Sequence, residues 1–180
     1  MALLRAETPK SLPHVETHVT GSVRHLCAAA ETSCRELGYR PTVLTASLCC
    51  EAREAGRFFA AIAAYYQQSR ESVAFIAGGE TVVHVRGKGL GGRNQELALS
   101  AAQGIAGMAD TALFSFGSDG TDGPTDAAGG YVDGRTCAAL EAQGRRIADA
   151  LDDNDAYHAL RAVDGLLMTG ATGTLSLIHI

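Results

Sequence analysis

Four glycines within six residues, with two cations beside them, form the first stretch of this 180-residue chain that could do chemistry. The stretch runs from Gly87 to Glu96 and contains Lys88 and Arg93. Glycine lets the backbone approach a ligand closely, and the helix expected after Gly92 supplies unpaired N–H groups and the positive end of a dipole. The stretch therefore predicts an anion-binding loop, with a structural turn as the alternative.

The glycine spacing also bears on which phosphate-binding motif is present. Gly87, Gly89 and Gly92 fit the G-x-G-x-x-G spacing of dinucleotide-binding loops. The acidic residue expected at the end of the following strand is not clear, since Asp110 precedes its strand. The Walker A pattern is absent. A dinucleotide site therefore stays a poorly supported alternative.

A second glycine-rich loop, residues 117–134, carries the three aspartates Asp119, Asp122 and Asp126. Carboxylates in such a loop suit Mg²⁺, which takes a few carboxylates together with waters and substrate phosphate. They also suit a base that acts on a hydroxyl group. Ordinary Asx-turns are the competing interpretation, because aspartate beside glycine is common turn chemistry.

A third loop, residues 169–174, has the sequence Thr-Gly-Ala-Thr-Gly-Thr. Each of the three loops follows a short apolar stretch that is predicted to be a strand. Ligands of open α/β sheets bind beyond the carboxyl ends of strands. We therefore expect the three loops to converge on one site.

The elements that must position these loops alternate between helix and strand. Helices are predicted over about 23–37, 50–68, 136–151 and 155–163, with one more from the glycine loop to Gly104 or Gly107; strands are predicted at 41–44, 73–77, 81–85, 112–116 and 165–168. The Gly78-Gly79 pair favours a hairpin between two of these strands, and Asn154-Asp155 is typical of a helix N-cap. The pattern predicts the α/β class, with a mixed β-sheet flanked by helices.

Composition excludes several classes of function. A hydrophobic content of 46% is enough for a core, while a net charge of −5 without a basic tract argues against nucleic acid or an anionic membrane as partner. No apolar run reaches the roughly 18 residues of a membrane span. Five cysteines without metal-ligand spacing indicate free thiols and a cytoplasmic location.

Four motifs in this order resemble the MOFRL family, the C-terminal lobe of the glycerate 2-kinases that are also labelled hydroxypyruvate reductases. The motifs are Gly78-Gly79-Glu80-Thr81, Gly87–Glu96, Asp119–Gly129 and Thr169–Thr174. The resemblance covers residues 14 to 174. It implies a MOFRL domain over 69–174, preceded over 1–68 by the tail of a Rossmann-like lobe.

The resemblance implies ATP-dependent phosphorylation of D-glycerate to 2-phosphoglycerate, with Mg²⁺ and with glycerate and ATP as the partners. It implies that Arg93 stabilises the transferring phosphoryl group and that Asp119, Asp122 and Asp126 hold Mg²⁺ or orient the glycerate hydroxyl. The other residues that it places at substrate or nucleotide are Glu80, Lys88, Gly89, Gly91, Gly92, Asn94, Gly170, Thr172, Gly173 and Thr174. An NAD(P)-dependent hydroxypyruvate reductase and a non-catalytic nucleotide- or anion-binding module remain as alternatives.

Members of the resembled family are considerably longer than this chain. We therefore expect a fragment that is inactive alone, whose oligomeric state the residues do not indicate. Residues 175–180, Leu-Ser-Leu-Ile-His-Ile, correspond in one codon choice to a transposon end used in sequencing libraries. We expect these six residues to be a non-native tail, and their nucleotide sequence would check this.

Overall fold

Helix α3 (Arg93–Gly104) is the element on which most of the described chain packs. Its residues from Gln95 to Ala102 are all buried, and it contacts α2, α5, α6 and the strands β3 and β4. The bounds of the other helices are α1 Val23–Glu36, α2 Ala52–Tyr66, α4 Thr136–Glu141, α5 Ile147–Asp152 and α6 Ala156–Arg161. The strands are β1 Arg40–Leu48, β2 Val73–Gly79, β3 Ala112–Phe116, β4 Gly129–Asp133 and β5 Leu166–Leu167.

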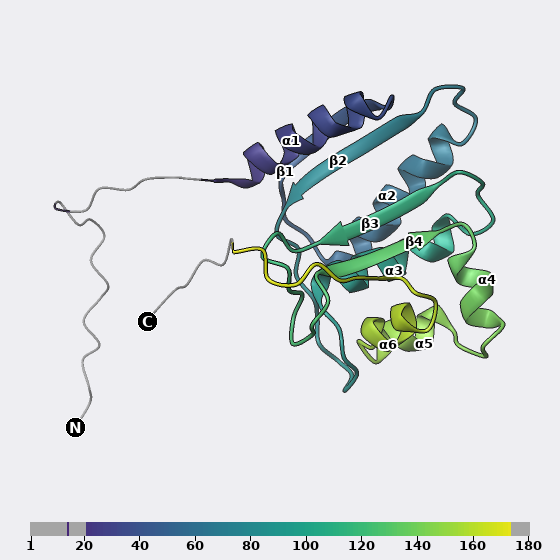
Figure 1. Cartoon of the computed structure of the whole chain (residues 1–180). Helices are drawn as coiled ribbons and strands as arrows, with labels where there is room; N and C mark the ends of the chain where they lie inside the picture. The colour runs from purple at the N-terminus through teal and green to yellow at the C-terminus, as the bar shows by residue number, and fades with distance from the viewer. Residues whose placement is uncertain (1–13, 15–20, 174–180) are drawn as a thin grey trace.

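The strands form two sheets of opposite type. β1 and β2 pair in parallel, whereas β4 lies between β3 and β5 and pairs antiparallel with both. Helix α1 packs on β1 and β2, and the short helices α4, α5 and α6 lie on the side of β4 (Figure 1). The predicted α/β class with parallel and antiparallel strands and flanking helices is therefore confirmed, with the two pairings divided between two sheets.

The predicted hairpin at Gly78-Gly79 is wrong. β2 continues through Gly79, which pairs with Leu48 at the end of β1. A Cβ atom at position 79 would lie 2.2 Å from the Leu48 carbonyl oxygen, so glycine here permits close approach of two parallel strands. Residues 81–85 form no strand; Val82 makes one isolated parallel bridge with Glu51.

The segment after β3 also differs from prediction. β4 lies within 117–134, which was expected to be loop throughout, because its two leading glycines resemble turn residues. The helices expected over 136–151 and 155–163 are three shorter helices. Gly144, with φ of +70°, follows the first of them and ends the helical backbone there.

The core lies along α3, where its side chains meet those of β4 and the short helices. Leu99, Ile105, Val132, Leu140 and Leu160 are its largest buried apolar side chains. On the other flank, α2 crosses α3 at Gly56, where an added Cβ atom would lie 2.2 Å from the Leu97 carbonyl oxygen. Both flanks therefore fix α3 in place.

The computed structural model describes residue 14 and residues 21–173. Among the described helices, none has both the length and the apolar character needed to cross a membrane. The predicted non-native tail, residues 175–180, lies outside the described residues. The division at residue 68 stays a prediction.

Candidate functional site

The start of α3 is capped by a carboxylate from a distant loop. Asp122 accepts hydrogen bonds from the backbone N–H of Asn94 at 3.1 Å and from that of Gln95 at 2.8 Å, and its side chain is 2% exposed. The residue at the N-cap position is Gly92, which has no side chain to accept these donors. Burial raises the pKa of the Asp122 carboxyl, although the hydrogen bonds from Gln95 and Asn94 act against this rise.

Asn94 joins this cap to β3. Its Nδ2 atom donates to Oδ1 of Asp122 at 3.0 Å, and its Oδ1 atom accepts a hydrogen bond of 2.6 Å from the Ser115 hydroxyl. Both ends of the amide are therefore engaged within the protein. Asn94 thus links the cap at the start of α3 to Ser115 of β3.

Arg93 lies on the outer side of the same turn. Its guanidinium is 3.3 Å from Oε1 of Glu80, which follows β2, and the two side chains are 45% and 76% exposed. The backbone N–H groups of Gly91, Gly92 and Arg93 form no hydrogen bond with other described residues. The helix start thus presents three free donors and one exposed cation.

The earlier part of the glycine loop is occupied by the protein itself. The N–H groups of Arg86 and Gly87 donate to the Asn154 side chain, and those of the next three residues donate to residues 153 and 155. A Cβ atom at Gly87 would lie 2.2 Å from the Asp153 carbonyl oxygen. Glycine in this part of the loop lets the backbone of residues 153–155 pack closely against it. Within the predicted anion-binding loop, only residues 91–93 therefore keep N–H groups that are unbonded among the described residues. The amide of Gly89 is held by Asp153, while the side chain of Lys88 is exposed.

The three aspartates do not share one position. Asp122 has both oxygens bound to α3, and Asp126 accepts a hydrogen bond of 2.8 Å from the Tyr157 hydroxyl. Asp119 is half-buried and accepts from the Thr121 amide in an Asx-turn. Within residues 21–173 no three carboxylate, histidine or cysteine side chains are grouped to hold a metal ion. The set does not fit a Mg²⁺ ion held jointly by the three aspartates.

The third loop packs on the second. The Thr172 amide donates to the Asp119 carbonyl at 3.2 Å, and the Thr172 hydroxyl donates to the Ser118 carbonyl at 2.5 Å. Gly170 lies against Gly120, where an added Cβ atom would lie 1.9 Å from the Gly170 carbonyl oxygen. Since Asp122 joins the second loop to the first, the predicted convergence of the three loops is confirmed. Gly173 is exposed beside them, and Thr174 lies outside the described residues.

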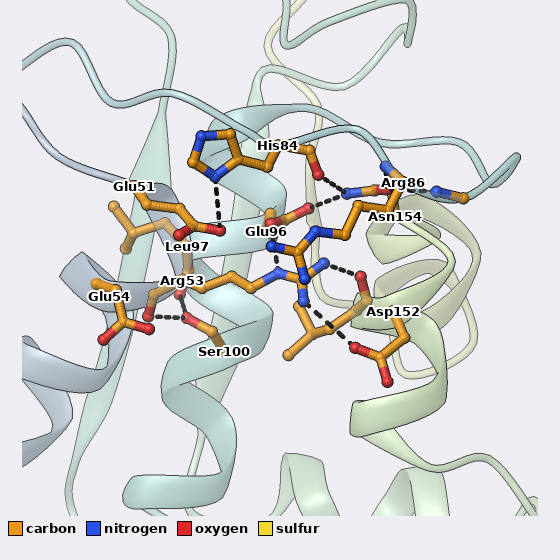
Figure 2. Close-up of polar contacts among 12 residues, drawn as sticks. Glu51, Arg53, Glu54, His84, Arg86, Glu96, Leu97, Ser100, Asp152 and Asn154 are labelled. Atoms are coloured by element: carbon orange, nitrogen blue, oxygen red, sulfur yellow. Dashed lines mark hydrogen bonds and ion pairs between the residues drawn. The ribbon is translucent and has the colours of Figure 1, made fainter.

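The structure adds residues that spacing did not indicate. Asp155 occupies the N-cap position of α6 as predicted, although its side chain makes no cap hydrogen bond there, and Asn154 binds the glycine loop instead. Arg53 of α2 forms a largely buried ion pair with Glu96 of α3, at 2.7 Å (Figure 2). A polar run at 152–155 was visible in the sequence, but its partner loop lies more than sixty residues earlier.

The sequence of the chain is similar to those of a known family and of several known proteins. Residues 73–175 match the MOFRL family. The chain is 51% identical over 172 residues to the D-glycerate 2-kinase of Thermotoga maritima, covering 93% of this chain and 41% of that protein. It is 39% identical over 170 residues to the glycerate 2-kinase of Pyrococcus horikoshii, covering 92% and 38%.

A solved structure of a glycerate kinase has a similar fold. The crystal structure of glycerate kinase from Thermotoga maritima superposes with a TM-score of 0.86 at 50% identity, over 93% of this chain and 41% of that one. The chain thus spans about two fifths of the length of these relatives.

Proposed function

Because the chain belongs to the MOFRL family, we propose that it forms part of a glycerate 2-kinase that transfers a phosphoryl group from ATP to D-glycerate. The names of the Thermotoga and Pyrococcus relatives support this assignment. The observation that carries it is the open start of α3, with the exposed Arg93 and three N–H groups that form no hydrogen bond within the described part of the chain.

Phosphoryl transfer depends on positioning and charge stabilisation more than on covalent chemistry by the protein. A helix start binds phosphate through free N–H groups and the positive end of its dipole. Asp122 takes the inner donors, at Asn94 and Gln95, and leaves the outer donors of Gly91, Gly92 and Arg93 for a ligand. We assign these outer donors to an ATP phosphate and the Arg93 guanidinium to the charge of the transferring group. The Arg93 guanidinium pairs with Glu80 at 3.3 Å at the outer side of the helix start.

We assign the second and third loops to the binding of glycerate, the phosphoryl acceptor. Asp119 is half-buried, beside the backbone of Thr172. A carboxylate there suits a base that orients and deprotonates the glycerate hydroxyl. We assign Gly170, Thr172 and Gly173 to the contact with the glycerate carboxylate. In this proposal the phosphoryl donor, ATP, binds at the start of α3, and the phosphoryl acceptor, glycerate, binds at the second and third loops.

No step of this reaction is assigned to a metal ion held by the three aspartates. Both carboxylate oxygens of Asp122 are bound at the start of α3, whereas Asp126 is exposed and accepts one hydrogen bond from Tyr157, so the two carboxylates have different surroundings. A nicotinamide-dependent reductase gains no support either. Gly87 and Gly89, two of the three glycines with the dinucleotide-binding spacing, pack against residues 153 and 155, so the close approach that these glycines would give a pyrophosphate is taken by the protein.

The test measures ADP release from ATP, with and without D-glycerate, for this chain and for the complete product of its gene. We expect glycerate-dependent release that Arg93→Ala lowers by about 100- to 1,000-fold, as for loss of a transition-state donor. Arg57→Ala is the matched control, because Arg57 is exposed on α2 and pairs only with Glu54 among the described residues. Absence of glycerate-dependent release from both proteins would overturn the kinase assignment. ATP binding without release would instead indicate a non-catalytic nucleotide-binding module.

A further inference from the structure

Asn154 makes every hydrogen bond that its side-chain amide allows. Its Oδ1 atom accepts from the backbone N–H of Arg86 at 2.7 Å and of Gly87 at 2.9 Å. Its Nδ2 atom donates to the His84 carbonyl at 3.3 Å and to Oε2 of Glu96 at 3.0 Å. Two acceptor and two donor positions are the full capacity of an asparagine amide. Figure 2 shows this residue between the glycine-loop backbone and Glu96.

Glu96 links Asn154 to helices α2 and α3. It is 2% exposed in the first turn of α3, and its Oε1 atom accepts from Nε of Arg53 in α2. Arg53 also donates to the Leu151 carbonyl and pairs with Asp152 at the end of α5 (Figure 2). Asn154 is therefore tied through one buried carboxylate to both long helices of the site. A fully satisfied buried network of this kind holds its members rigidly.

These contacts fix both ends of the segment that leads into α3. Asn154 holds its beginning at Arg86 and Gly87, and through Glu96 it holds the helix turn ten residues later. The free N–H groups of Gly91, Gly92 and Arg93 lie between these two anchors. Their position therefore depends on a side chain that touches none of them.

Resting on the kinase function proposed above, we propose that Asn154 is a positioning residue of the phosphate cradle at Gly91–Arg93, acting together with the nearer contacts of Asp155 to Leu90 and of Asp122 to Asn94. It acts through the loop backbone and Glu96, without contact to substrate. Asparagine suits the place for two reasons. Its φ is +55°, which asparagine tolerates better than most residues, and the role needs acceptor and donor on one side chain.

Asn154→Asp is the informative variant because it keeps the shape and the acceptor oxygen. It removes both donors and places a second carboxylate against Glu96. Repulsion between the new carboxylate and Glu96 should push the side chain off the loop, so we expect faster hydrogen exchange at the amides of Arg86 and Gly87. We further expect weaker ATP binding and a kcat about 10- to 100-fold lower, since small misplacements of a reacting group cost this much. Asp149→Asn is the matched control, because Asp149 is exposed on α5 and pairs with Arg146.

The readouts separate positioning from loss of structure. Circular dichroism and the exchange of buried α3 amides such as Leu99 show whether Asn154→Asp stays folded. ATP titration followed by the amide signals of Gly91 and Gly92 reports the cradle directly. If Asn154→Asp unfolds, Asn154→Gly is measured in the same way, since it removes the contacts without adding charge and accepts the positive φ at this position. A folded variant with wild-type ATP affinity and wild-type kcat would overturn the proposal.

The wild-type protein separates this proposal from the kinase function. ATP-induced shifts at Gly91 and Gly92 without glycerate-dependent ADP release would overturn the kinase function alone; weaker ATP binding by Asn154→Asp would then still support positioning of the cradle. No shift at Gly91 and Gly92 would overturn the positioning proposal, because there would be no cradle to position.

Discussion

Oδ2 of Asp122 accepts a hydrogen bond of 2.8 Å from the backbone N–H of Gln95, although the two residues lie 27 positions apart. The carboxylate of the second glycine loop thereby becomes the N-terminal cap of the central helix. An aspartate that looked like a metal ligand in the sequence is a structural part of the site.

Asp122→Ala should lower the free energy of unfolding by about 1–3 kcal/mol, because it leaves buried donors at the start of α3 without an acceptor. Urea denaturation of the purified chain measures this. Asp149→Ala provides the control, since surface substitutions usually change stability by about 0.5 kcal/mol or less. Equal stabilities for the two variants would show that the cap contributes nothing.

The Asp122 carboxyl should also leave a signature in the pH dependence of stability. Burial raises its folded-state pKa, so the folded chain holds this proton more tightly than the unfolded chain does. The resulting stability is fully present below the unfolded pKa of about 3.9 and is lost as pH rises through the folded pKa. Unfolding free energies of the wild type minus those of Asp122→Asn should therefore fall with rising pH above that value. A difference that is flat, or that rises, contradicts the assignment.

The Arg53–Glu96 pair should behave as a buried ion pair. Arg53→Met alone should destabilise the chain by about 3–5 kcal/mol, because it leaves the Glu96 carboxylate buried without its cation. The double variant Arg53→Met/Glu96→Met should recover much of this loss, since two apolar side chains leave no uncompensated charge. A double-mutant cycle by urea denaturation measures the coupling. Additive losses would mean that the two side chains act independently.

Gly56→Ala should destabilise the chain although alanine favours helix by about 1 kcal/mol over glycine. The added methyl group would lie 2.0 Å from the Ser100 hydroxyl oxygen and 2.2 Å from the Leu97 carbonyl oxygen. Overpacking typically costs about 1–3 kcal/mol, so the helix crossing outweighs the propensity. Thermal unfolding measures the sign, with Ala61→Gly on the exposed side of α2 as the control for propensity alone. A higher melting temperature for Gly56→Ala would contradict the close crossing.

Local patterns in the sequence predicted much of the fold. Helices near 23–37 and 50–68 and the strands at 73–77 and 112–116 are present, because apolar periodicity and stop signals such as Gly38 act within one element. Two of the errors arose where glycine had a tertiary role. Gly78-Gly79 suggested a turn but permits a close parallel pairing, and Gly129-Gly130 concealed β4.

The site was predictable in outline but not in its internal bonding. Convergence of the second and third loops followed from their places after β3 and β5, whereas the first loop meets them although residues 81–85 form no strand. Which backbone N–H groups are bonded within the protein and which stay free could not be predicted, because this depends on contacts between residues far apart in the chain. Asn154 reaches Arg86 and Gly87, and Asp122 reaches Asn94, only once the chain has folded. No spacing rule along the sequence reports such pairs.

The burial of α3 along its length has a thermodynamic consequence for any ligand at its start. Donors on a helix clamped by α2 on one flank and by the β4 side on the other are already ordered before binding. A phosphate group that meets them need not supply the free energy for immobilising a flexible loop. Calorimetry of ATP binding should then show an entropic penalty from the nucleotide with little added by the protein, and the backbone order parameters of Gly91–Arg93 should be high before ATP is added.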